Sequence, residues 1–214
     1  MEATALLTLP LILFLSFTAN GMSAKDDTSI VNQSPVIFDS DGDELRSGGT
    51  YYILPSLRNL PRSYSPAIVP GVFSKDTCWL QLGIEEYNYK ITGVPVTLSP
   101  IKPTNDAYIS ETTTLHVNFS DGLSPLCGGS TVLNVGDFGD KFLSLGGAVE
   151  DGSSWFKIKR VSRWNDGVYK LVSSSGGDVG ISTRFDGSRR LVLTRRNPLS
   201  FQFVAVKNIP SATK

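Results

Sequence analysis

Short segments in which apolar and polar residues alternate recur along most of this chain, and they limit its fold more than any other feature. They lie at residues 51–54, 79–84, 94–98, 114–119, 131–135, 155–161, 168–172, 179–183, 190–194 and 199–206. Turn-forming pairs such as Asp186-Gly187 and Asn197-Pro198 separate them. No apolar pattern at helical spacing continues for more than about two turns beyond Pro35. The pattern predicts an all-β chain of about a dozen short strands, arranged as a barrel or a sandwich.

Residues 36–55 form the most regular stretch of the sequence. Residues 36–38 are apolar, residues 39–43 are an acidic turn cluster containing Gly42, and residues 51–54 are a second apolar run closed by Pro55. Taken alone, two such runs around a glycine-containing turn predict a β-hairpin.

The charge balance argues against a polyanionic partner. Lys and Arg together number 20, as do Asp and Glu, so the formal net charge is zero. We therefore expect neither nucleic acid nor an anionic membrane among the partners. Hydrophobic residues make up 40% of the chain, enough for one well-filled core. We expect one monomeric domain over residues 25–214.

Residues 1–24 have the pattern of a secretory signal peptide. Residues 6–17 are mostly apolar, a run too short to cross a bilayer, which takes about 20 residues. Small residues 19–24 follow, and we expect cleavage after Ala24. The start, Met1-Glu2, lacks the usual basic residue, and a buried core helix is the alternative. The prediction is an extracellular or vacuolar protein without a membrane segment in its mature form.

Secretion makes a disulfide between Cys78 and Cys127 the expected state of the only two cysteines. On the chain-entropy model, a loop of roughly 49 residues closed in this way adds about 4 kcal/mol to stability. Two buried free thiols are the alternative.

Two stretches match the acceptor pattern for N-glycosylation. Asn118 begins Asn-Phe-Ser, and Asn32 begins Asn-Gln-Ser, which is followed by Pro35. Asn118 is therefore the better candidate of the two.

No set of residues in the sequence predicts an enzyme, a metal site or a cofactor site. The single histidine, His116, lies in a predicted strand away from any serine-elbow motif, and we expect it to be a strand residue with a satisfied hydrogen bond. Asp39, Asp41 and Asp43 alternate like the start of a calcium loop, but Thr50 stands where the closing Glu is required, so an ordinary turn is expected. We expect no catalytic residues, no metal and no cofactor.

Several longer motifs resemble those of the plant soybean-trypsin-inhibitor (Kunitz-type) family. The stretch 36–55, with its Gly-Gly-x-Tyr-Tyr-Ile-Leu-Pro ending, is similar to the amino-terminal signature of that family. Further similar segments lie at residues 74–78, 126–129, 155–158, 168–172, 178–181, 187–193 and 198–203. The resemblance implies a β-trefoil of about twelve short strands, a pseudo-threefold barrel with a hairpin cap. The family's second small disulfide is missing here, because residues 173–177 read Ser-Ser-Ser-Gly-Gly.

The resemblance also assigns an inhibitory loop, which consists of Ser99, Pro100, Ile101, Lys102 and Pro103. Lys102 takes the family's primary specificity position, as a cation for the acidic pocket of a trypsin-like protease. Pro103 follows it, and a residue without an N–H disfavours ordinary cleavage and resealing of that bond. Ser47 replaces the family's loop-supporting Asn with a shorter side chain.

The function implied is that of a secreted peptidase inhibitor, with a serine endopeptidase, or else a cysteine peptidase, as its partner. The alternative is a non-inhibitory storage, defence, carbohydrate-binding or protein-binding β-trefoil. A hydrolase on the same fold is a third option.

Overall fold

A computed structural model of the chain describes residues 34–56, 64–74, 77–86, 93–102, 107–120, 123, 129–136, 141–162 and 167–206. These residues contain the strands β1 (Thr50–Pro55), β2 (Tyr64–Ser74), β3 (Thr77–Glu86), β4 (Val96–Pro100), β5 (Thr114–Phe119), β6 (Leu133–Val135), β7 (Leu143–Leu145), β8 (Phe156–Arg160), β9 (Tyr169–Ser173), β10 (Asp178–Thr183), β11 (Arg189–Thr194) and β12 (Phe201–Ala205), and the 3-10 helix η2 (Gly152–Ser154). The all-β prediction is confirmed. No helix in this part of the chain has the length and apolar character needed to cross a membrane.

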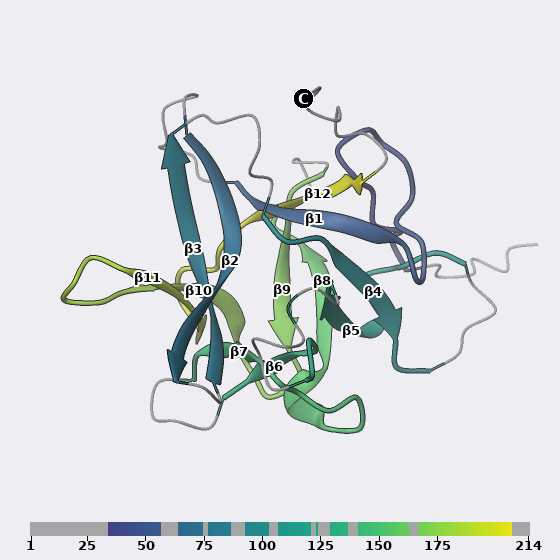
Figure 1. Cartoon of the computed structure of the whole chain (residues 1–214). Helices are drawn as coiled ribbons and strands as arrows, with labels where there is room; N and C mark the ends of the chain where they lie inside the picture. Colours follow the sequence, from purple (N-terminus) through teal and green to yellow (C-terminus); the bar gives the residue numbers. More distant parts are fainter. Residues whose placement is uncertain are drawn as a thin grey trace, which may run out of the picture. The chain divides into compact units, whose positions relative to one another are not determined.

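Six of the strands close into a barrel (Figure 1). Neighbours in the ring run in the order β12, β1, β4, β5, β8 and β9, and the pairing of Phe201 in β12 with Tyr169 in β9 closes it. A closed ring leaves none of these six strands with an open edge, so each has a hydrogen-bonding partner on both sides.

The other six strands form three hairpins, β2–β3, β6–β7 and β10–β11. Each hairpin lies in the sequence between two barrel strands, and the hairpins pair with one another through β3–β7 and β11–β3. The chain thus repeats one unit of four strands three times. This repeat is clear in the topology, although the sequence shows it only weakly.

The barrel interior is filled by side chains that alternate along the strands. In β1, for example, Tyr51 and Ile53 are buried while Tyr52 and Leu54 are half-buried. The largest fully buried side chains include Tyr169, Phe156, Phe201 and Phe203. The Phe203 ring lies 5.9 Å from that of Tyr169 and 6.5 Å from that of Tyr51, measured between ring centroids. Each such aromatic side chain stabilises the fold by about 1.5–3 kcal/mol through burial.

Two strands were missed by the sequence pattern. The first, β2, contains Pro66, Pro70 and Gly71, which normally break a strand. It pairs with β3 alone among the described strands, and proline is tolerated on such an edge because no second partner needs its N–H. The second, β7, has three residues that are all buried, so it shows no alternation.

The predicted hairpin between residues 36–38 and 51–54 is wrong. Residues 36–38 instead fold back on the nearby residues 44–46, with Asp39 N–H bonded to the Asp43 carbonyl and Leu45 N–H to the Ile37 carbonyl, both at 2.8 Å. β1 pairs with β12 and β4. The apolar pattern identified both segments as extended but carried no information on their partners.

Several predicted features fall on residues outside the described part of the chain. These are the signal peptide over residues 1–24, Asn32, Pro103 and Cys127. Cys78 lies in β3 and is 1% exposed. The Cys78–Cys127 bridge therefore stays a prediction.

Candidate functional site

The predicted inhibitory loop continues directly from a barrel strand that is paired on both sides. β4 pairs with β1 through Val96 and Thr97, and with β5 along its whole length as far as Pro100 opposite Leu115. Ser99 and Pro100, predicted as loop residues, are thus the last two residues of β4. The barrel fixes the direction in which the chain leaves the sheet.

Lys102 lies two residues beyond the end of β4 and is exposed. Ile101 just before it is half-buried, and its N–H donates to the Thr114 carbonyl of β5 at 3.0 Å. The backbone is therefore anchored up to the residue that precedes Lys102, while the ammonium group extends toward solvent.

One tight turn, residues 46–49, holds the chain on both sides of the loop. Gly48 N–H donates to the Leu98 carbonyl, before the loop, and Ser47 N–H donates to the Ala107 carbonyl, after it, both at 2.8 Å. The turn itself is closed by Gly49 N–H bonded to the Arg46 carbonyl at 3.0 Å. Because one rigid element bonds to both flanks, the distance between the two ends of the loop is fixed before any partner binds.

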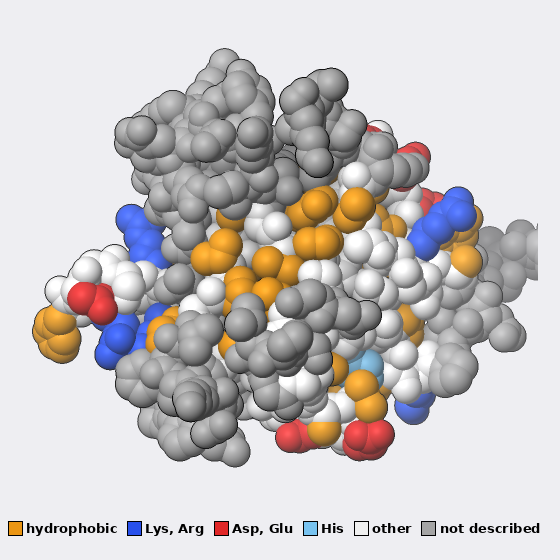
Figure 2. Space-filling view, in the orientation of Figure 1, with side chains coloured by type: hydrophobic (Ala, Val, Ile, Leu, Met, Phe, Trp, Pro, Cys, Tyr) orange, Lys and Arg blue, Asp and Glu red, His pale blue; other side chains and the backbone are white. Residues whose placement is uncertain are grey.

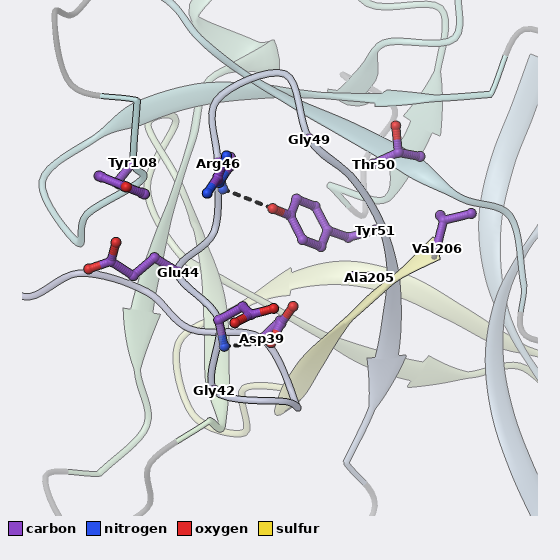
Figure 3. Close-up of a pocket in the computed structure, with 11 residues that line it drawn as sticks. Asp39, Gly42, Glu44, Arg46, Gly49, Thr50, Tyr51, Tyr108, Ala205 and Val206 are labelled. Carbon is purple, nitrogen blue, oxygen red and sulfur yellow. Dashed lines mark hydrogen bonds between the residues drawn. The ribbon is translucent and has the colours of Figure 1, made fainter. Parts of the chain in front are cut away.

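Tyr51 supports this turn from below (Figure 3). Its hydroxyl accepts a hydrogen bond from Arg46 N–H at 2.8 Å, and the residue is 6% exposed. A Cβ added to Gly49 would stand 2.7 Å from the Tyr51 ring and hydroxyl, and Gly48 has a φ of +72°. The Gly-Gly pair is therefore required by two different constraints: Gly48 by its backbone angle and Gly49 by the tyrosine beneath it.

Removing the Tyr51 hydroxyl should destabilise the protein without changing its core volume. Tyr51→Phe leaves the partly buried Arg46 N–H without its acceptor, and we expect a loss of about 1–2 kcal/mol in the free energy of unfolding. Tyr52→Phe is the matched control, because Tyr52 lies on the opposite face of β1 and is half-buried. Urea unfolding of both variants measures the difference, and equal stability would show that the hydroxyl does not hold the turn.

Two polar residues of β5 face the start of the loop. Asn118 Nδ2 donates to Ser99 Oγ at 3.4 Å, a long hydrogen bond, and His116 pairs with Ser99 in the ladder. His116 is 6% exposed, and its Nδ1 has no hydrogen-bond partner within the described part of the chain. The expected satisfied histidine is thus wrong for this atom. Glycosylation of Asn118 stays a prediction, although the residue is half-buried in a paired strand.

An open depression of about 670 Å³ lies beside the loop. Its lining consists of three loop residues, five hydroxyl side chains, one indole and one further ammonium: Pro100, Ile101, Lys102, Ser110, Thr112, Thr113, Thr114, Ser174, Trp155 and Lys157. Trp155 is fixed there by its Nε1–H, which donates to the Val149 carbonyl at 3.0 Å. The lining holds two cations and no carboxylate, so this face attracts negatively charged groups.

Sequence reasoning found part of this site and missed the rest. It predicted Ser47 as the loop support through its side chain; in the structure the Ser47 side chain is exposed, and its backbone N–H bonds to the Ala107 carbonyl. It did not identify Gly48, Gly49 or Tyr51 as the support. The Gly-Gly-x-Tyr pattern could have indicated these residues, because paired glycines are typical of a backbone with a positive φ and of a close approach to another side chain.

The acidic turn is an ordinary turn, as expected. Asp39 Oδ1 accepts hydrogen bonds from Asp41 N–H at 2.9 Å and Asp43 N–H at 3.0 Å. Asp39 is 4% exposed, and its carboxylate caps the turn, as Asp side chains commonly do.

Similar proteins share the sequence and the architecture. The Kunitz-type trypsin inhibitor KTI2 of Glycine max is 32% identical over 177 residues, which cover 78% of this chain and 83% of the relative. Miraculin of Synsepalum dulcificum is 31% identical over 209 residues, covering 88% of this chain and 90% of the relative.

A solved structure extends the likeness to the fold. The soybean trypsin inhibitor in complex with porcine pancreatic trypsin matches with a TM-score of 0.61 and 28% identity, over 80% of this chain and 99% of that chain. Soybean Kunitz inhibitors are β-trefoils, and this chain shares their fold. The predicted β-trefoil is thereby confirmed. The model of the Kunitz legume family, described as trypsin and protease inhibitor, matches residues 37–205. The chain therefore belongs to the Kunitz legume family of trypsin and protease inhibitors.

Proposed function

We propose that this protein inhibits a trypsin-like serine endopeptidase by presenting Lys102 to the acidic specificity pocket of the enzyme. The observation that supports this most is the position of Lys102, exposed immediately after a paired barrel strand and between two flanks bonded to one turn. A lysine held in this way has little backbone entropy left to lose on binding. The protein acts as an inhibitor and not as an enzyme.

Pro103 determines whether the bound inhibitor is cleaved. The bond that follows Lys102 joins it to a proline, which has no N–H and a fixed φ near −65°. An acylating serine would find this bond poorly oriented, while the pocket contact of Lys102 does not depend on it. The inhibitor therefore blocks the active site without accumulating a cleaved form.

Titration of bovine trypsin with the purified secreted protein tests this proposal. We expect stoichiometric loss of trypsin activity and an inhibitor that stays intact by mass spectrometry after prolonged incubation. Papain, assayed in parallel, tests the cysteine class. If trypsin keeps full activity at micromolar inhibitor, the proposed function is wrong.

Lys157 adds a second cationic contact beside the loop. Ile101, just beyond the end of β4, bonds to Thr114 of β5, and Thr114 pairs with Lys157 of β8. The three residues lie in one row across the sheet, so the Lys157 backbone is about 10 Å from that of Ile101. Its neighbours Lys159 and Lys170 pair with Glu111 and Asp178, whereas Lys157 has no carboxylate partner among the described residues.

Lys157→Glu should therefore slow association with trypsin. We expect the association rate constant to fall by about threefold to tenfold at low salt, with a smaller effect at high salt. Lys141→Glu is the matched control, since Lys141 is exposed and precedes β7 in the β6–β7 hairpin, whereas Lys157 lies in the barrel strand β8. Stopped-flow inhibition at two ionic strengths measures both, and identical rates for the two variants would rule out a contact at Lys157.

Secretion and the disulfide belong to the same proposal. We expect the mature chain to begin at Lys25, to be an extracellular or vacuolar monomer, and to carry the Cys78–Cys127 bridge. Thiol titration of the denatured, unreduced protein should detect no free thiol. Two reactive thiols per chain would show that the bridge is absent.

A non-inhibitory binding module is the second candidate function. Two observations favour it: Pro103 after the specificity residue, and a relative, miraculin, whose name does not designate an inhibitor. The depression with Trp155 and five hydroxyl groups has the chemistry of a saccharide site. A glycan array distinguishes the two functions, because specific glycan binding without trypsin inhibition fits only the second.

A further inference from the structure

The depression beside the loop contains a half-buried ammonium without a counter-charge. Lys157 pairs with Thr114 of β5 on one side and with Val172 of β9 on the other, so its backbone is fixed within the barrel wall. The residue is half-buried and lines the depression. Among the described residues it forms no ion pair. Because partial burial of an ammonium costs free energy unless an anion compensates it, a negatively charged ligand would stabilise this group.

The carboxylates of the neighbouring strands and turns are already paired with other cations. Glu111 oxygens lie 4.0 Å from Lys159 Nζ and 3.5 Å from Arg160 Nε, and an Asp178 oxygen lies 2.9 Å from Lys170 Nζ. Figure 2 shows Lys and Arg side chains in small separate groups on the visible face, and its coloured side chains form no continuous basic surface there. The positive charge of the depression is therefore local, which suits a short anionic ligand.

Trp155 presents a fixed aromatic ring to the same depression. Its backbone is extended and it stands two residues before Lys157, so the two side chains point to the same face about 7 Å apart. Its Nε1–H donates to the Val149 carbonyl at 3.0 Å, and its own carbonyl accepts the Ser174 N–H at 2.9 Å. Since the indole N–H is already engaged, Trp155 contacts a ligand through its ring. An aromatic face of this kind packs well against the C–H face of a sugar ring.

Three hydroxyl groups in the lining, those of Ser110, Thr112 and Thr113, hold one another in place and form a hydroxyl cluster. Ser110 Oγ lies 3.1 Å from Thr112 Oγ1 and 3.1 Å from Thr113 Oγ1. The turn that carries them is closed by Thr113 N–H bonded to the Ser110 carbonyl at 3.0 Å, and Ser110 N–H donates to Thr113 Oγ1 at 3.0 Å. Each hydroxyl has one donor and two acceptor positions, so the cluster can still bond to the hydroxyl groups of a saccharide.

We propose that this depression binds an oligosaccharide that contains uronic acid residues. One sugar ring packs on Trp155, its carboxylate pairs with Lys157, and its hydroxyl groups bond to the hydroxyl cluster. Lys102, which lines the same depression, supplies a second ammonium for the next uronate.

The three kinds of lining group together favour a uronate over simpler ligands. A neutral sugar would leave the half-buried Lys157 without a counter-charge, and a small inorganic anion would leave the Trp155 ring without a contact. This inference rests on the second candidate function and narrows its saccharide to an acidic one.

Isothermal titration of the secreted protein with trigalacturonate tests the proposal. We expect saturable binding with a dissociation constant below about 1 mM, and weaker binding as salt is added. Maltotriose has three neutral sugar rings, and citrate has carboxylates but no sugar ring; each should bind at least about tenfold more weakly. Equal binding of citrate would mean charge attraction alone, and this outcome or the absence of saturable trigalacturonate binding would overturn the proposal.

The control sugar separates this proposal from the function on which it rests. If maltotriose binds as tightly as trigalacturonate, a saccharide-binding module remains and only the acidic ligand is wrong. If no glycan binds, both are wrong. No protease is present in the titration, so the result does not depend on trypsin inhibition.

Variants of the protein locate the ligand, with thermal unfolding as the folding check. Lys157→Met removes the ammonium but keeps an unbranched side chain, and it should weaken trigalacturonate binding by at least about tenfold. Lys159→Met is the matched control, because Lys159 lies two residues further along β8, pairs with Glu111 and does not line the depression. It should change binding by less than about twofold. Equal losses for the two variants would mean general charge attraction and no site.

Tryptophan fluorescence reports the contact of the sugar ring. Trigalacturonate should change the emission of the wild-type protein, and this change should be absent from Trp155→Phe, which should also bind the ligand at least about threefold more weakly. An undiminished fluorescence change in Trp155→Phe would show that the sugar binds elsewhere.

Discussion

Trypsin inhibition should fall by at least about 30-fold when Lys102 is replaced by alanine, which corresponds to about 2 kcal/mol of binding free energy. Among the described residues that follow β4, Lys102 carries the only group that can enter an acidic specificity pocket, since Ile101 is half-buried and its N–H is bonded to β5. Because Lys102 is exposed and makes no ion pair among the described residues, its removal should leave stability unchanged. The loss therefore reports binding and not folding.

The inhibition constant of each variant is measured against one trypsin preparation, with thermal unfolding as the folding check. Lys102→Arg should keep most of the inhibition, because a guanidinium also carries a positive charge at the same reach. Lys141→Ala is the matched control for removal of an exposed ammonium away from the loop. Inhibition by Lys102→Ala equal to that of the wild type would show that this loop is not the contact.

Pro103→Ile completes the same series. Isoleucine restores an N–H and a freer φ at the bond after Lys102, so we expect tighter inhibition of trypsin and a cleaved form that accumulates slowly. The wild type should show neither. A cleaved wild-type inhibitor would mean that Pro103 does not control the chemistry at this bond.

The topology could be predicted only in part from the residues themselves. Alternation located most strands because one face of each is buried, as in β1, β9 and β12. It could not assign partners, since β1 pairs with β12 about 150 residues away, and nothing local encodes that distance. The threefold repeat lies in the order of barrel strands and hairpins. Very different side chains can form that order, so the repeat is hard to see in the sequence.

One local trace of the repeat was visible and had a physical cause. Gly-x-Tyr stands at the start of β1 and of β9, as Gly49 to Tyr51 and Gly167 to Tyr169. In both places the tyrosine is buried, and its hydroxyl accepts a backbone N–H from the segment that follows residue 35: Arg46 for Tyr51 and Phe38 for Tyr169. The pattern therefore marks two positions where the barrel ties down its amino-terminal segment.

The candidate site, like the fold, could be predicted only in part from the sequence. Lys102 was predicted from its position in a motif, and in the structure it is exposed two residues beyond β4, while its role in inhibition stays a prediction. The two backbone N–H groups of Ser47 and Gly48, which bond to the two flanks of the loop, are called the clamp here. Sequence reasoning did not identify the clamp, because a backbone hydrogen bond does not depend on the type of side chain. Lys157 could not be associated with Lys102 before the register of β5 and β8 was known.

Gly49→Ala should be the most damaging single change outside the barrel core. The new Cβ would stand 2.7 Å from the Tyr51 ring, closer than side chains tolerate, so either the turn or the tyrosine must move. Tyr51 cannot move freely, since its ring is buried against Phe203 and its hydroxyl holds Arg46 N–H. We expect a loss of about 2–3 kcal/mol in the free energy of unfolding.

The same substitution should weaken trypsin inhibition by at least about tenfold in molecules that remain folded, because Gly48 and Ser47 lose their alignment with the two flanks of the loop. Gly152→Ala is the matched control: its added Cβ would meet only a Trp155 ring atom at 4.0 Å, an ordinary contact. Urea unfolding and the inhibition constant are measured for both variants. If Gly49→Ala lowers stability but inhibits trypsin as tightly as the wild type, the turn supports the fold without positioning Lys102, and the clamp has no functional role.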